Sequence, residues 1–162
     1  MKTISFIGYV SQDTKEELVS TFSDYGFNLV FNQERKHAFK IKLVNFISRG
    51  GKSAAGENPV IGFAALNEDV AYVAYPVAST LNCNCTKSSL FTNSDRLFAL
   101  TCVHEVLHLI GLNHCRNLQC IMAKTKCRTK KSNYCLPCLS TRRQKIDLCK
   151  TCFEKFTQAQ LV

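Results

Sequence analysis

The segment HEVLHLIGLNH, residues 104–114, places three histidines and a glutamate at a spacing suited to metal chemistry. His104 and His108 are four residues apart, so on a helix their rings stand on the same face, one turn from each other. Gly111 tolerates the left-handed conformation that ends a helix and turns the chain, which would return His114 as a third ligand. Three neutral imidazoles leave the fourth position of a tetrahedral zinc ion open to water, as a catalytic site requires.

Glu105 directly follows the first histidine and is expected to face that water. Zinc lowers the pKa of its bound water toward about 7 and polarises a substrate carbonyl. A carboxylate beside it can take a proton from the attacking water and pass it to the leaving amine. A bare HExxH also occurs by accident on helices whose histidines are merely buried or solvated, but the extended HExxHxxGxxH is far rarer. The pattern therefore predicts metal-assisted hydrolysis, most naturally of a peptide bond.

The extended motif is the signature of the metzincin peptidases, which also have a downstream methionine turn. Met122, eight residues after His114, is the sole internal candidate for that methionine. More narrowly, HEVLHLIGLNHCRNLQCIM resembles the archaemetzincins, whose motif continues from the third histidine into C-x4-C-x-M and a later C-x-x-C. Here that continuation is Cys115, Cys120 and Met122. The resemblance implies a metzincin-like fold and a zinc metalloprotease, with aminopeptidase-like action on short peptides.

The resemblance also implies a second, structural zinc bound by Cys115, Cys120 and one C-x-x-C pair. Because Cys115 adjoins His114, the two side chains tend to project in different directions and can serve different ions. Two pairs could complete the site: Cys135 with Cys138, and Cys149 with Cys152. The first pair comes early and the second late for the family, so the spacing does not decide between them. We favour the later pair, because LCKTCFEKF resembles the family's terminal knuckle running into a last helix.

All ten cysteines fall between residues 83 and 152, in the half of the chain that holds the motif. Without an export signal, such cysteines favour metal binding over disulfides. If the later pair binds zinc, an insertion contains Cys127, Cys135 and Cys138; it could hold a further metal, or leave Cys127 as a reduced thiol. Cys102 is expected to be a small core residue, and Cys83 and Cys85 have no assigned role.

The residues before the motif predict the scaffold that positions it. Five segments have the composition and alternation of strands: 3–10, 27–32, 37–47, 60–66 and 70–77. A helix with Ser11 or Asp13 as its N-cap follows the first strand and stops near Gly26. Its expected apolar stripe is Leu18, Val19 and Phe22. The last two strands form a hairpin around residues 67–69, and a long helix over 95–110, capped by Asn93 or Ser94, carries the first two histidines.

The expected fold class is α/β (α+β): a metzincin-like zincin fold with a mixed twisted sheet, an active-site helix and a small zinc-stabilised C-terminal segment. We expect a single domain over residues 1–162. Residues 1–111 would form the sheet and active-site helix, and residues 112–162 the methionine turn and cysteine-rich segment. The start of the chain is too short and too polar for an export signal, and no apolar run is long enough for a membrane span. An intracellular, cytoplasmic protein is the resulting expectation.

The net charge of +9 is concentrated in the C-terminal segment. Residues 1–115 contain ten basic and ten acidic residues, whereas residues 116–162 contain eleven basic and two acidic ones. An alternative function is therefore a non-enzymatic zinc protein whose basic segment binds nucleic acid or a partner protein. The charge has a simpler explanation, because four thiolates around one zinc leave a net charge of −2 that nearby cations offset. With no recognised nucleic-acid-binding motif, peptide or protein substrates are the expected partners.

Overall fold

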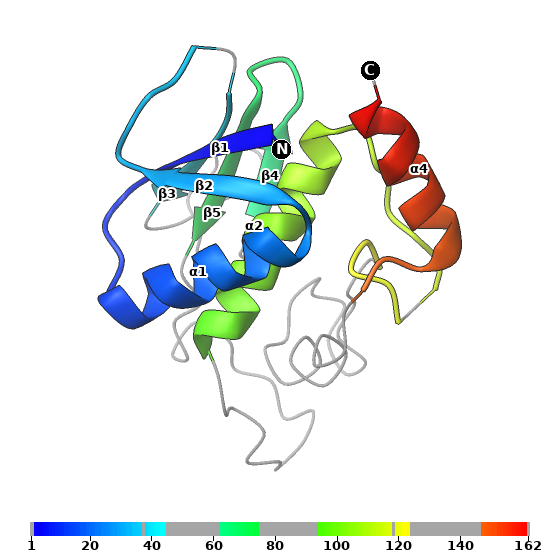
Figure 1. Cartoon of the computed structure of the whole chain (residues 1–162), viewed down its shortest axis with the longest axis horizontal. Helices are drawn as coiled ribbons and strands as arrows, with labels where there is room; N and C mark the ends of the chain where they lie inside the picture. The colour runs from blue at the N-terminus through cyan, green and yellow to red at the C-terminus, as the bar shows by residue number, and fades with distance from the viewer. Residues whose placement is uncertain are drawn as a thin grey trace, which may run out of the picture.

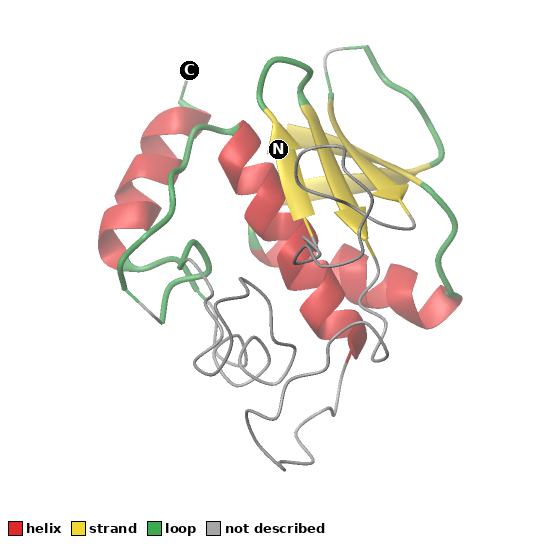
Figure 2. Cartoon of the chain, turned by 180° about the vertical axis from the view of Figure 1, so that it is seen from behind, coloured by secondary structure: helices red, strands yellow, loops and turns green. Residues whose placement is uncertain are grey.

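The structure is a computed structural model that describes residues 2–36, 38–44, 62–74, 94–117, 119–123 and 147–161. Within these ranges, a five-stranded mixed sheet packs against helices (Figures 1 and 2). The strands are β1 (Lys2–Ile7), β2 (Phe27–Phe31), β3 (Phe39–Val44), β4 (Gly62–Ala65) and β5 (Val70–Ala74). The helices are α1 (Gln12–Asp24), α2 (Ser94–Leu109) and α4 (Lys150–Gln160). The expected mixed α/β class is confirmed.

The strand order is β2-β1-β3-β5-β4, with β4 at one edge. Four strands run parallel, and β4 pairs antiparallel to β5 as the hairpin predicted from the sequence. Asp69 closes this hairpin at φ 54°, in the left-handed region that aspartate tolerates. Both β4 and its neighbour β5 lie against α2, and Gly62 in β4 meets the side chain of Glu105 in the second half of that helix.

The first two strands are shorter than the sequence pattern predicts, for local reasons. β1 stops at Ile7 because Gly8 leaves the strand conformation, at φ 150°, and its N–H donates to the Asn32 side-chain oxygen at 3.0 Å. β2 stops at Phe31 because Asn32 has φ 52°. Residues 37, 45–47, 60–61 and 75–77 of the other predicted strands lie outside the described residues, whereas Ala38 and Leu66 are described and lie just outside β3 and β4.

Helix α1 starts where a capping residue was expected. The Ser11 hydroxyl accepts a hydrogen bond from the backbone N–H of Thr14 at 3.1 Å, which satisfies one free donor of the first turn. The buried positions follow helical spacing: Thr14, Leu18, Thr21 and Phe22. Val19 is 47% exposed, so its predicted place in the apolar stripe is wrong. It stands about 100° around the helix from Leu18, and Thr21 takes the buried position beside Phe22.

Helix α2 lies in the centre of the molecule, between the sheet and α4 in both views (Figures 1 and 2). Its middle is buried all round, which is typical of a helix enclosed by other elements. Its fully buried side chains are Phe98, Ala99, Cys102, Val103, Val106 and Leu107. The expectation that Cys102 is a core residue is thus confirmed.

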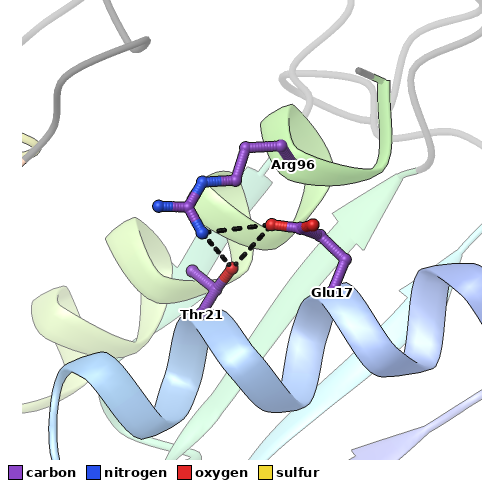
Figure 3. Close-up of polar contacts among 3 residues, drawn as sticks. All are labelled: Glu17, Thr21 and Arg96. Atoms are coloured by element: carbon purple, nitrogen blue, oxygen red, sulfur yellow. Dashed lines mark hydrogen bonds and ion pairs between the residues drawn. The ribbon is translucent and has the colours of Figure 1, made fainter.

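Polar contacts fix the first turns of α2 to α1. The Arg96 guanidinium donates to a Glu17 carboxylate oxygen at 3.1 Å and contacts the Thr21 hydroxyl at 3.0 Å (Figure 3). The Thr14 hydroxyl donates to the Asp95 carboxylate at 2.7 Å. These contacts set the position of the helix that carries the motif.

Helix α4 packs beside the N-terminal strand ends. Its Phe156 ring meets Phe27 edge-on, with centroids 5.8 Å apart, and the Lys2 ammonium donates to the Ala159 carbonyl at 3.3 Å. No helix in the described part of the chain is both long and apolar enough to cross a membrane.

Candidate metal and catalytic site

The three motif histidines converge on one point at the end of α2. His104 and His108 come from consecutive turns of the helix, and His114 comes from the segment after it. The Nε2 atom of His108 lies 3.1 Å from Nε2 of His104 and 3.3 Å from Nε2 of His114. His104 is buried, His108 half-buried and His114 exposed, so the cluster opens toward solvent on one side.

A Schellman turn ends α2 and brings the third histidine back. The Gly111 N–H bonds to the His108 carbonyl at 2.9 Å, and the Leu112 N–H bonds to the Leu107 carbonyl at 3.0 Å. Gly111 has φ 102°, a conformation that side chains strongly disfavour. This is the turn that the sequence pattern predicted.

Two of the rings are oriented by backbone carbonyls. Nδ1 of His104 lies 2.7 Å from the Ile121 carbonyl oxygen, and Nδ1 of His108 lies 2.6 Å from the Leu112 carbonyl oxygen. A carbonyl can only accept, so each Nδ1 carries the proton and donates it. The Nε2 lone pairs of both rings therefore point into the cluster, ready for a metal.

The cluster fits a zinc ion in size and chemistry. Nitrogen ligands about 2.05 Å from a tetrahedral ion are about 3.3 Å from each other, close to the two measured separations. Without a cation, the unprotonated Nε2 atoms of His104 and His108 would direct lone pairs at each other, which is unfavourable. The geometry therefore suits a three-histidine zinc site with a fourth position free.

Glu105 is buried, with 7% of its surface exposed, at the position after the first ligand on α2. Its carboxylate lies against the backbone of Gly62 in β4. Because it directly follows a histidine of the cluster in the sequence, this buried carboxylate is the candidate general base of the site.

Four cysteines form a second cluster: Cys115, Cys120, Cys149 and Cys152. Their sulfur atoms all lie within 4.8 Å of one another, and those of Cys115 and Cys149 are 3.7 Å apart. Sulfur ligands about 2.3 Å from a tetrahedral zinc are about 3.8 Å apart, so this cluster also fits zinc. All four positions are filled by protein, which is typical of a structural site.

The thiols of this cluster have perturbed pKa values. Burial, and then hydrogen bonds with its cysteine neighbours, raise the pKa of Cys152 well above the ordinary thiol value. Burial likewise raises the pKa of Cys120. The pKa of Cys149 is lowered, chiefly by the backbone N–H of Cys152 in the first turn of α4. Buried thiols crowded together resist losing all their protons unless a cation compensates, which again suits zinc.

The segment 115–123 contributes two cysteines to one cluster and a backbone carbonyl that orients a histidine of the other. The Cys115 N–H donates to the Met122 carbonyl at 2.7 Å, and the Ile121 N–H donates to the Asp147 carbonyl at 3.2 Å. Ile121 supplies the carbonyl for His104, while its neighbour Cys120 belongs to the four-cysteine cluster. Met122, the expected Met-turn residue, is completely buried in this segment.

The structure thus brings the predicted residues together in two groups, one of histidines and one of cysteines. Of the two candidate pairs, Cys149 and Cys152 lie with Cys115 and Cys120, whereas Cys135 and Cys138 lie outside the described residues, as do Cys83, Cys85 and Cys127. Sequence reasoning missed the two orienting carbonyls and Gly62. A glycine inside a predicted strand is a known sign of close approach, and could have pointed to Gly62.

No protein-family model matches this sequence, and no curated protein matches it. Solved structures match it closely in shape. Archaemetzincin from Methanopyrus kandleri has a TM-score of 0.64 at 14% identity, over 99% of this chain and 96% of its own. Archaemetzincin from Archaeoglobus fulgidus, complexed with malonate, has a TM-score of 0.61 at 18% identity, over 96% of this chain and 99% of its own.

A third structure is the zinc-dependent peptidase from Methanocorpusculum labreanum, with a TM-score of 0.57 at 14% identity, over 95% of this chain and 99% of its own. At these identities the likeness concerns the fold, and it extends over nearly the whole length of each chain. The chain has the fold of the archaemetzincins, as the motif in residues 104–122 had indicated.

Proposed function

We propose that this protein is a zinc-dependent peptidase with two zinc ions, one catalytic and one structural. The observation that carries the proposal is the convergence of the three histidine Nε2 atoms, with that of His108 3.1 and 3.3 Å from the other two, together with the buried Glu105 that directly follows His104. A purely structural three-histidine site has no use for a carboxylate at that position. The likeness to solved archaemetzincins and to a zinc-dependent peptidase supports the same function.

His104, His108 and His114 would hold the catalytic ion. When bound there, zinc supplies a Lewis acid that activates water and polarises the substrate carbonyl. The Ile121 and Leu112 carbonyls keep two of the rings in the tautomer that binds metal. The exposed His114 side leaves access for a peptide.

Glu105 would act as the general base. Its carboxylate takes a proton from the attacking water and returns it to the departing amine as the peptide bond breaks. Because the side chain is buried against β4, few orientations are open to it, and little reorganisation is needed during the reaction.

Cys115, Cys120, Cys149 and Cys152 would hold the second ion as a structural site. This ion would tie the segment after α2 to the start of α4, two regions separated by residues 124–146. Metal binding would add a cross-link to the apolar contacts that Ile121, Met122 and Phe156 make in the core.

Replacement of Glu105 tests the proposed chemistry. Glu105→Gln keeps the side-chain size but removes the base, and we expect cleavage of short peptides to fall at least about 100-fold with zinc content unchanged. Glu16→Gln, an exposed amide substitution on α1, is the matched control and should cleave normally. Unchanged cleavage by zinc-loaded Glu105→Gln would exclude the proposed mechanism.

Aminopeptidase-like action is the finer part of the proposal. Peptides with a free N-terminus should be cleaved, one residue at a time, faster than the same peptides with an acetylated N-terminus. Equal rates on both, with internal cleavage products in the mass spectrum, would instead identify an endopeptidase.

A further inference from the structure

Gly62, in the edge strand β4, lies directly against the side chain of Glu105. A Cβ atom built on Gly62 would lie 2.5 Å from Oε1, 2.6 Å from Cγ and 2.8 Å from Cδ of Glu105. Separations below 3.0 Å are essentially never seen for real Cβ atoms. The overlap includes Cγ, so turning the terminal carboxylate alone would not relieve it, and the whole side chain would have to move.

The backbone at this position does not itself require glycine. Gly8, Gly26 and Gly111 have positive φ angles, which other residues rarely adopt, but Gly62 is not among them. An alanine could therefore take the backbone conformation of Gly62 in β4. The requirement for glycine comes from the space that Glu105 occupies.

The strand register explains why the two residues meet. Gly62 is paired with Val73, and Ala64 with Ala71, and both β5 partners are completely buried. Side chains alternate along a strand, and Phe63, between Gly62 and Ala64, is 55% exposed on the opposite face. Position 62 therefore points toward α2, and its missing side chain leaves the room that Glu105 fills.

We propose that Gly62 is a positioning residue, whose bare Cα fixes the orientation of the Glu105 carboxylate. The inference rests on the proposed role of Glu105 as general base. It makes the identity of residue 62 a determinant of turnover, even though that residue offers no reactive group.

The substitution Gly62→Ala tests this inference in the zinc-loaded full chain. We expect kcat to fall at least about 10-fold with KM within about twofold, because the base is displaced while the metal site is untouched. Bound zinc should stay at the wild-type level. Ala64→Ser adds one atom to the same face of β4 and is the control, with kcat expected near wild type. A kcat for Gly62→Ala within about threefold of wild type, or a loss of zinc that accounts for the lost activity, would overturn the proposal.

A thermal-unfolding cycle tests the contact without relying on catalysis. Gly62→Ala should lower the Tm by about 3–10 °C in the wild-type background, as expected for one overpacked methyl group. In a chain that already carries Glu105→Ala, Gly62→Ala should lower the Tm by at most about 1 °C, because the side chain that it would overlap is gone. An equal loss of Tm in both backgrounds would overturn the inference. If no peptide is cleaved by the wild-type chain, the proposed function fails, but this cycle still decides whether Gly62 positions Glu105.

Discussion

At the scale of single residues, protonation decides what each cluster can bind. The histidine rings receive their metal-binding tautomer from the Ile121 and Leu112 carbonyls. Two of the cysteines instead keep protons on the atoms that would bind metal, because burial raises the pKa of Cys120 and Cys152 above the ordinary thiol value. The histidine site is thus prepared for zinc in the folded chain, whereas the cysteine site must release protons to bind it.

The raised thiol pKa values predict a pH dependence of the metal-free protein. Its folded state keeps protons on Cys120 and Cys152 that the unfolded chain releases near the ordinary value of 9.0. The folded state therefore loses stability as the pH rises through about 9 toward the higher folded-state values. The lowered pKa of Cys149 acts in the opposite sense only below about 9, because above that value its thiol is deprotonated in both states. We therefore expect the Tm of the metal-free chain to fall between about pH 9 and about pH 10.

The zinc-loaded chain is the control for this effect, since its thiolates stay deprotonated and bound throughout. Burial also raises the pKa of Tyr25 and of Cys102, and a hydrogen bond with Glu68 raises that of Tyr72, and these causes are common to the metal-free and zinc-loaded chains. If the Tm of the metal-free and zinc-loaded chains depended equally on pH, the cysteine cluster would not be the cause of the fall in Tm. Melting followed by far-ultraviolet circular dichroism in matched buffers measures both curves.

At the scale of elements, the segment 115–123 links the two clusters. It begins directly after His114, contains Cys115 and Cys120, and supplies the Ile121 carbonyl that orients His104. Its ends are joined by the Cys115–Met122 backbone hydrogen bond. The cysteine cluster is therefore expected to hold in place the chain on which two of the three histidine ligands depend.

Loss of the cysteine site should consequently weaken metal binding at the histidine site. Cys152→Ser should lower the affinity of the histidine cluster for zinc by about 10- to 100-fold, the usual effect of disturbing groups that orient metal ligands. Competition with a chromophoric chelator measures this affinity, and the visible spectrum of Co²⁺ distinguishes the nitrogen site from the sulfur site. Cys102→Ala, which removes a cysteine outside both clusters, is the control. Unchanged affinity in Cys152→Ser would show that the two sites are independent.

The sequence predicted the helix that carries the histidine site, but it did not predict where the first two strands end. The histidine site followed from local rules, because His104, Glu105 and His108 are held by one helix and Gly111 sets its end. The ends of β1 at Ile7 and of β2 at Phe31 were missed, because both depend on Asn32, which has a left-handed backbone and accepts a hydrogen bond from the Gly8 N–H.

Other features depended on long-range packing and could not be read from spacing. The choice between the two C-x-x-C pairs depends on where the chain returns after more than twenty residues, which the motif does not specify. Val19 was misassigned because helical periodicity does not say how wide the buried face is. The contact of Gly62 with Glu105 joins residues 43 positions apart, and only the arrangement of α2 against β4 creates it.

At the scale of the whole molecule, one apolar core extends from the sheet and helices into the segment that holds the cysteines. The sheet, α1 and α2 share a continuous apolar core, with fully buried residues such as Phe6, Leu18, Ile41 and Phe98. The segment that holds the cysteines contributes Ile121, Met122 and Phe156 to the same core. We expect zinc in the cysteine cluster to add a cross-link to this packing, because residues 124–146 separate its two halves along the chain. The basic charge of residues 116–162 lies mostly outside the described residues, so binding of nucleic acid stays an untested alternative.

The most direct test of the account is the number of zinc ions on the intact chain, measured by native mass spectrometry. We predict two ions per wild-type chain, and one in each of the variants His108→Ala and Cys115→Ser. The ion that remains should be bound by sulfur in His108→Ala and by nitrogen in Cys115→Ser, as zinc-edge X-ray absorption would show. A single zinc per wild-type chain, or loss of both ions from His108→Ala, would contradict the claim that the histidines and the cysteines form two distinct zinc sites.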